Sequence, residues 1–191
     1  VGVLITGFRF SIELLQAMYM PVPGKEDFSS LDASTRLLLP LGGGLFVGLL
    51  MQFVFKNARQ VGVVHVMERL SYHQGYLPWQ NAVAQFVGAI LSIASGQSVG
   101  REGPGIHLGA ANGSLLGQWL HLPNNSIQTL VACGSAAAIA ASFNTPLAGV
   151  IFAMEVVMME YTLRGFTPVI LAAVSATAVT RLTYGDAPAF A

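Results

Sequence analysis

Charged residues are scarce in this sequence, and their scarcity excludes most soluble folds. Asp, Glu, Lys and Arg make up 9% of the 191 residues, whereas 53% are hydrophobic and the mean hydropathy is +0.61. A soluble domain averages about 25% charged residues. The basic and acidic residues cancel to a formal net charge of zero, so the charge balance indicates no nucleic-acid partner. The composition predicts an integral, multi-pass protein of the lipid bilayer.

Cysteine is almost absent, and neither a secretory leader nor a soluble domain is recognisable. The single cysteine, Cys133, lies in an alanine-rich stretch without a second cysteine for an internal disulfide, so we expect it to pack as a small residue. The chain begins at Val1 and shows no basic segment before a cleavage site. We therefore expect trimmed ends or a fragment of a longer protein.

Residue patterns for metal binding are also missing. His65 and Glu68 are expected near one helix face, and His73 follows, but no His-Glu-x-x-His pattern and no cysteine accompanies them. We expect His65 to be a loop histidine with satisfied hydrogen bonds. We expect no metal site and no cofactor.

Two adjacent charges, Arg101 and Glu102, stand between glycines at the centre of the longest apolar region. No Lys, Arg, Asp or Glu occurs in residues 70–100 or 103–154, and either span can cross a bilayer core, which takes about 20 apolar residues. A charge at that depth costs roughly 2.5–3.5 kcal/mol on translocon scales, so it is retained where it pairs, faces a polar cavity or has a function. A buried ion pair that only fixes packing is the alternative to a functional site.

Pro104 indicates that a helix begins at this motif, because proline is favoured in the first helical turn. A helix start leaves backbone N–H groups unpaired and presents the positive end of the macrodipole. Broken helices whose N-termini point at an anion near the midplane are common in transporters. The motif therefore predicts an anion site made of backbone amides, with the Glu102 carboxylate competing for the same place.

The rest of the sequence predicts about seven or eight helical segments, several of them too short or too broken to span a membrane simply. Glycines recur at every fourth position after Pro104, and such a ladder lets another helix pack tightly against one face. The ladder comprises Gly105, Gly109, Gly113 and Gly117. Besides the helix that carries it, the expected segments are 1–20, 37–55, 61–70, 81–95, 127–142, 147–158 and 166–180. Residues 25–36 are expected to form a polar loop.

The motif from Gly100 to Pro104, GREGP, resembles the signature of the CLC chloride channels and proton-coupled chloride exchangers. The run from Gly134 to Val150, GSAAAIAASFNTPLAGV, resembles the same family's following segment at the expected spacing. The resemblance covers essentially the whole chain and is weak before about residue 37. It implies an all-α integral membrane fold, a CLC-type bundle of tilted and broken transmembrane helices. The family's membrane domain consists of two inverted halves, and residues 1–191 would form most of the N-terminal half. They should not complete a pore by themselves.

The resemblance also implies roles for individual residues. Glu102 matches the family's gating glutamate, and the backbone amides of Arg101 and Gly103 match donors of its outer anion site. Gly62 matches a glycine of the family's Gly-Ser-Gly-Ile-Pro loop, but the serine that offers a hydroxyl to the central chloride falls at Val61. Because valine has no side-chain donor, we expect a central site that relies on backbone amides.

A second departure from the family bears on mechanism. Glu155 matches the first of a glutamate pair in the exchangers, whereas the second glutamate, associated with internal proton delivery, falls at Val156. Proton transfer needs a titratable group within hydrogen-bond reach, and Glu160 could substitute for the missing glutamate. We therefore expect a passive voltage- or pH-gated chloride channel gated by Glu102. The alternatives are a proton-coupled chloride antiporter and a structural half-domain that is inactive without its second half.

The remaining expectations follow from the same resemblance. Chloride would be the bound substrate, and a homodimer would form through the helices matching residues 147–158 and 166–180, in a bacterial inner membrane. An enzyme with Glu102 as general base lacks an accompanying nucleophile or metal set, so no enzymatic activity is expected. His107 lies five residues past Glu102; packing is the expected role, and tuning of the Glu102 protonation is the alternative.

Overall fold

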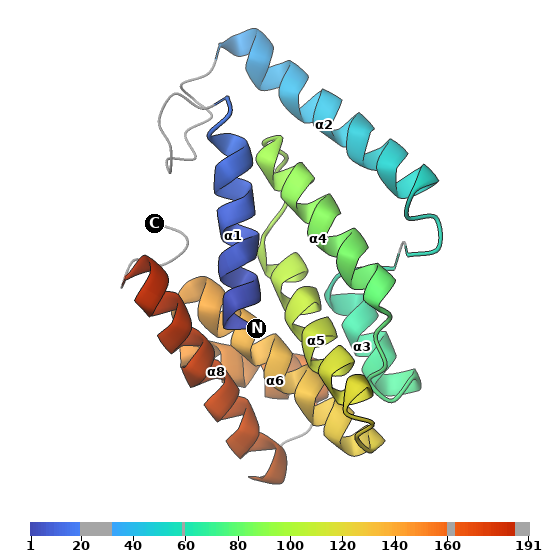
Figure 1. Ribbon diagram of the computed structural model, residues 1–191, viewed down its shortest axis with the longest axis vertical. Helices are drawn as coiled ribbons and strands as arrows, with labels where there is room; N and C mark the ends of the chain where they lie inside the picture. The colour runs from blue at the N-terminus through green and yellow to red at the C-terminus, as the bar shows by residue number, and fades with distance from the viewer. Residues whose placement is uncertain (20–31, 59, 160–162, 186–191) are drawn as a thin grey trace.

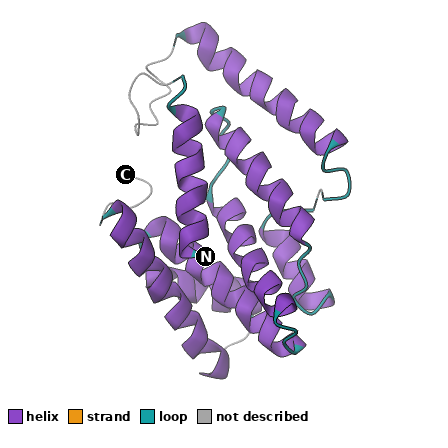
Figure 2. Cartoon of the chain, in the orientation of Figure 1, coloured by secondary structure: helices purple, strands orange, loops and turns teal. Residues whose placement is uncertain are grey.

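The chain folds into an all-helical bundle in the computed structural model, which describes residues 1–19, 32–58, 60–159 and 163–185 (Figure 1). Within these ranges every regular element is a helix, as the cartoon coloured by secondary structure shows (Figure 2). This confirms the predicted all-α class. The elements in chain order are α1 (Gly2–Gln16), α2 (Ala33–Phe53), α3 (Val63–Tyr72), α4 (Trp79–Ala94), α5 (Glu102–Trp119), α6 (Asn124–Phe143), α7 (Pro146–Phe152), a π-helical turn (Ala153–Met158) and α8 (Leu163–Tyr184).

Helices α5 and α6 form the centre of the bundle and pack backbone to backbone. A methyl group at Gly109 would overlap the carbonyl oxygen of Gly134, and one at Gly113 would overlap that of Leu130. The relation is mutual, since a methyl group at Gly134 would overlap the Gly109 carbonyl. The predicted tight packing on the glycine ladder is therefore confirmed, and α6 is the helix that occupies that face.

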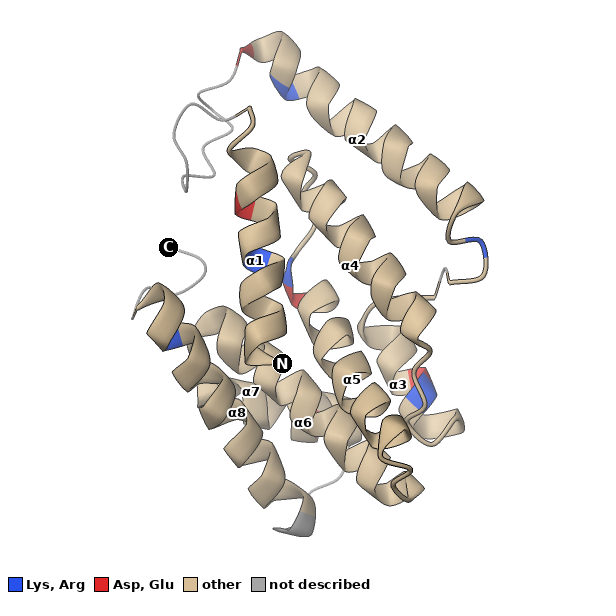
Figure 3. Cartoon of the chain, in the orientation of Figure 1, with Lys and Arg blue, Asp and Glu red and all other residues tan. Residues whose placement is uncertain are grey.

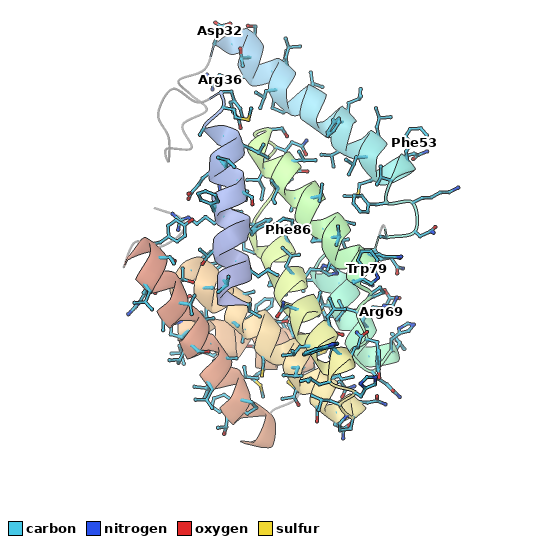
Figure 4. The ribbon with its side chains drawn as sticks, viewed as in Figure 1. Asp32, Arg36, Phe53, Arg69, Trp79 and Phe86 are labelled. Carbon is cyan, nitrogen blue, oxygen red and sulfur yellow. The ribbon has the colours of Figure 1, made fainter. Side chains whose placement is uncertain are left out.

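Apolar clusters join the other helices to this pair. Phe8 and Ile12 of α1 pack with Ile90 of α4 and Leu108 of α5. Figure 4 labels Phe86 on α4, whose ring lies 5.7 Å from that of Phe8 (Figure 4). A second cluster joins α6, α7, the π-helical turn and α8. These contacts fix α1, α4 and α8 around the start of α5.

Helix α2 lies at the edge of the bundle, where it packs on α4. None of its residues is buried, and it is one of three described helices long and apolar enough to cross a membrane, with Asn124–Phe143 and Gly165–Tyr184. The helix starts earlier than the expected residue 37, because the Asp32 side chain caps it by accepting a hydrogen bond from the Ser34 backbone N–H. The end of the expected polar loop is therefore helical; residues 25–31 of that loop lie outside the described residues.

The expected helix over residues 147–158 is confirmed as one apolar helical segment, Pro146–Met158, whose second part is π-helical. Asn144 ends α6 in a left-handed conformation, and Pro146 starts α7 in its first turn. From Ala153 the chain continues as a π-helical turn, which ends at Met159, a residue with φ of 53°. Such turns occur mostly as short insertions in helices and are frequent at functional sites. The turn carries Glu155 and Val156.

Candidate functional site

The centre of the candidate site is the first turn of α5. Figure 3 shows charged residues at its N-terminal end, in the middle of the bundle (Figure 3). Arg101 is the N-cap, and the first helical hydrogen bond runs from the Gly105 N–H to the Arg101 carbonyl over 3.0 Å. The N–H groups of Glu102 and Gly103 therefore have no partner within the helix, and Pro104 has no N–H to offer. The helix begins at Glu102, two residues before Pro104 and within the motif at which a helix start was expected.

The Glu102 side chain folds back over the start of its own helix. A methyl group at Gly100 would overlap one carboxylate oxygen of Glu102, so the carboxylate lies close to the backbone at Gly100. A carboxylate in a first turn interacts favourably with the positive end of the helix dipole. Apart from its chain neighbours and the backbone of α5, no atom lies within 4 Å of the place where a methyl group on the Cα of Gly103 would sit. The same turn thus holds an acidic group beside a glycine that carries no side chain.

Arg101 extends into different surroundings from Glu102. Its side chain lines a small pocket between α1, α6 and α8, together with Arg9, Ser142 and Tyr184. Arg9 forms an ion pair with Glu13 over 2.8 Å. The two neighbouring charges of the motif therefore contact different parts of the bundle.

Val61 and Gly62 precede a second helix N-terminus, that of α3. Gly62 is the N-cap with φ of 88°, a conformation that favours glycine, and the space beside it is open. Val61 lines a recess of about 370 Å³ together with Pro104 from the first turn of α5. The structure thus brings together two segments that the family resemblance assigned to one anion pathway.

Two polar side chains of α4 line the same recess, and no sequence motif had pointed to them. They are Gln85 and Ser92, both buried, on the face of α4 that also carries Gly88. Met51 of α2 covers Gly88, since its terminal methyl would overlap a methyl group placed there. The available signal was a pair of polar residues seven positions apart in a helix without full charges.

Val156 lies away from this recess, in the π-helical turn. It is half-buried, its neighbour Glu155 is exposed, and Val157 packs in the cluster that includes Val66 of α3. Val156 is not among the residues that line the recess with Val61 and Pro104. Glu160, the expected substitute in a proton pathway, lies outside the described residues.

A buried histidine pair links α3 to α5. His65 Nδ1 lies 3.0 Å from His107 Nε2, and the Arg69 Nε–H donates to His65 Nε2 over 3.2 Å. Because His65 Nε2 accepts, its Nδ1–H donates to His107. The expectation of a loop histidine at position 65 was wrong: the amphipathic segment 63–72 is helical, and it turns His65 inward. Its spatial partner is 42 positions away, so local spacing could not identify it.

Known proteins resemble this chain across most of its length. Residues 43–191 match the family described as voltage gated chloride channel. A ClcB-like chloride channel protein of Ralstonia nicotianae is 37% identical over 160 residues, which are 82% of this chain and 37% of that protein. The voltage-gated ClC-type chloride channel ClcB of Escherichia coli is 32% identical over 194 residues, covering 95% of this chain and 45% of that protein.

Two solved structures share the fold. The crystal structure of a slow cyanobacterial Cl⁻/H⁺ antiporter is similar with a TM-score of 0.71 and 26% identity. That of a CLC-type fluoride/proton antiporter is similar with a TM-score of 0.77 and 28% identity. Each similarity covers 96% of this chain and 44% of the other. The chain therefore spans less than half the length of these four relatives.

Proposed function

The chain belongs to the CLC family of voltage gated chloride channels and their antiporter relatives, and on that premise we propose that it contributes the first half of a pathway for chloride or similar small anions. It is a multi-pass membrane protein of that family. One observation carries the proposal: the residue before the N-cap of α3 and the first turn of α5 line one recess. A helix N-terminus favours a dehydrated anion without a full positive charge, so an anion held beside these two helix starts would bind weakly enough for release.

Glu102 is the proposed gate of this pathway. Its carboxylate folds over the start of α5 beside Gly103, so it occupies a position that an anion would also favour. In the closed state the carboxylate fills the outer site, and protonation or displacement by an anion opens it. The backbone amides of Arg101 and Gly103 are the proposed donors to the outer anion. Gly62, which carries no side chain, is proposed to let an anion at the central site approach the start of α3.

We propose passive chloride conduction rather than exchange. Val156 supports this, because a valine in place of the exchanger glutamate carries no proton. The ClcB relative is named a channel. Proton-coupled antiport is the second candidate, since both solved relatives are antiporters. In that case Glu160 or another group would carry the proton.

The assembly and membrane are also proposals. A second half would complete each pathway, and a homodimer would bury the apolar side chains exposed on α7 and α8, such as Leu147 and Leu171. The bacterial relatives support a bacterial inner membrane.

The gate hypothesis is tested by chloride flux from liposomes that hold the full-length natural protein. We expect flux to rise as the external solution is acidified, and we expect Glu102→Ala to carry chloride without this dependence. Glu68→Gln, on α3, is the matched control and should keep the wild-type response. Persistent gating by external pH in Glu102→Ala would contradict the proposal.

A further inference from the structure

Gln85 is a buried polar side chain with no role in the function proposed so far. It lies in the second turn of α4 and is 8% exposed, within a stretch that contains no full charge. Its amide oxygen is buried and has no hydrogen-bond partner among the described residues. Buried amides are nearly always paired, because an unmade hydrogen bond forfeits the solvation of that group. As placed, this oxygen is an acceptor; a half-turn of the amide puts the –NH₂ end in the same unpartnered position, where its N–H groups would donate to a ligand that the protein itself does not supply.

The recess beside α4 gives this amide access to the proposed anion pathway. Gln85 lines it together with Val61 before α3 and Pro104 in the first turn of α5. Ser92, 9% exposed, lines it from the same face of α4, two turns along. Most of the other lining side chains are aliphatic. The two polar residues of α4 therefore line the same recess as Val61, which precedes α3, and Pro104, in the first turn of α5.

The chemistry of an amide fits this position. Val61 has no donor, so an anion at the start of α3 lacks a side-chain hydrogen bond there. A glutamine amide carries two N–H donors, and a half-turn about its last bond exchanges its oxygen and nitrogen ends. A neutral donor holds a permeating ion less tightly than a lysine or arginine would.

We propose that Gln85 contacts the permeating anion directly, supplies the side-chain donor that Val61 does not, and sets the preference among small halides. This inference rests on the proposed function. The ligand class is a small monovalent anion, partly dehydrated, held between the Gln85 amide and the backbone amides at the helix starts.

The test compares Gln85→Leu with Gln16→Leu in the full-length natural protein. Gln16 is a matched control, since it is 4% exposed, its amide nitrogen is buried without a partner among the described residues, and it lies on α1. Binding of chloride, bromide and fluoride is measured by calorimetry at constant ionic strength. We expect Gln85→Leu to weaken chloride binding about tenfold or more, as for loss of a hydrogen bond to a charged group, and to change the order among the halides. Gln16→Leu should bind as the wild type does.

Unchanged affinity and unchanged halide order in Gln85→Leu would overturn the proposal. If that variant does not fold, Gln85→Asn replaces it, because it keeps the amide but withdraws it by one methylene. Weaker chloride binding in Gln85→Asn supports a direct contact, and wild-type binding contradicts one. A wild-type protein that neither binds nor conducts halides would instead contradict the proposed function itself, so the two failures are distinguishable.

Discussion

Gly109 of α5 and Gly134 of α6 lie against each other's carbonyl oxygens, so that neither position has room for a methyl group. This contact sets the separation of the two central helices. The site depends on it, because the first turn of α5 is held where α6 fixes the rest of that helix.

We predict that Gly109→Ala destabilises the protein. The added methyl group meets backbone of α6, which cannot turn aside as a flexible side chain could, and overpacking of this kind costs about 1–3 kcal/mol. The thermal unfolding midpoint of the purified protein in detergent should fall. Gly7→Ala on α1 is the control, because nothing lies within 4 Å of its added methyl group, and the better helix propensity of alanine should raise stability by up to about 1 kcal/mol. Equal midpoints for the two variants would mean that the α5–α6 contact is looser than described.

We predict that Val61→Ser strengthens chloride binding. The substitution places a hydroxyl donor in the recess beside Pro104, and a hydrogen bond to a charged group is consistent with an affinity gain of about tenfold. Chloride-dependent thermal stabilisation at constant ionic strength reports this change, because a ligand that binds only the folded state stabilises it by mass action.

Val61→Ala is the matched variant for this measurement, since it enlarges the recess without adding a donor. If Val61→Ser and Val61→Ala respond alike to chloride, volume rather than hydrogen bonding controls the site. In that event Val61 has no place among the anion-contacting residues.

We predict that replacing Gly62 with alanine impairs the start of α3. With φ of 88° and ψ of −174°, Gly62 has a backbone conformation that is essentially restricted to glycine and that an alanine adopts at a cost of about 1–3 kcal/mol. Gly62→Ala should lower the unfolding midpoint and weaken chloride binding together, because the helix start itself shifts. A lower unfolding midpoint with wild-type chloride affinity would show that the start of α3 does not contribute to the anion site.

We predict a pH-dependent contribution from the cap of α2, outside the membrane-spanning residues. Hydrogen bonds from the Ser34 hydroxyl and backbone N–H lower the pKa of Asp32 below its ordinary value of 3.8. A lowered pKa in the folded state means that the cap stabilises the protein above pH 3.8, and that this contribution is lost as the pH falls through the folded-state pKa. The midpoint difference between wild type and Asp32→Ala should therefore be present at pH 7 and shrink below pH 3.8. A difference that stays constant with pH would show that the carboxylate charge is not involved.

Local patterns were enough to predict several features of the fold. The helix start within the motif from Gly100 to Pro104 and the glycine face of α5 depend on residues within a few turns of one another, so the sequence contains the necessary information. The uncharged residues 37–55 predict that α2 begins at residue 37, whereas it begins at Ala33. The capping residue that sets this start, Asp32, lies before the uncharged residues. The helix over residues 147–158 was predicted, but its change to π-helical hydrogen bonding after Phe152 was not, because no residue in that segment forbids an ordinary α-helix.

Contacts between residues far apart in the sequence could be identified only from the structure. The meeting of Val61 with Pro104 was expected only through the family resemblance, since nothing near either residue indicates the other. The spacing of Gln85 and Ser92 places them on one face of α4, but only the structure shows the recess that this face lines. His65 and His107 are far apart in the sequence, and only tertiary packing of their helices makes them a pair.

The most direct measurement is chloride efflux from liposomes that hold the full-length natural protein, with external pH recorded at the same time. We predict chloride movement without accompanying proton movement, as expected if Val156 interrupts the proton path. Proton movement in the opposite sense, in fixed ratio to chloride, would contradict passive conduction and identify the protein as an antiporter.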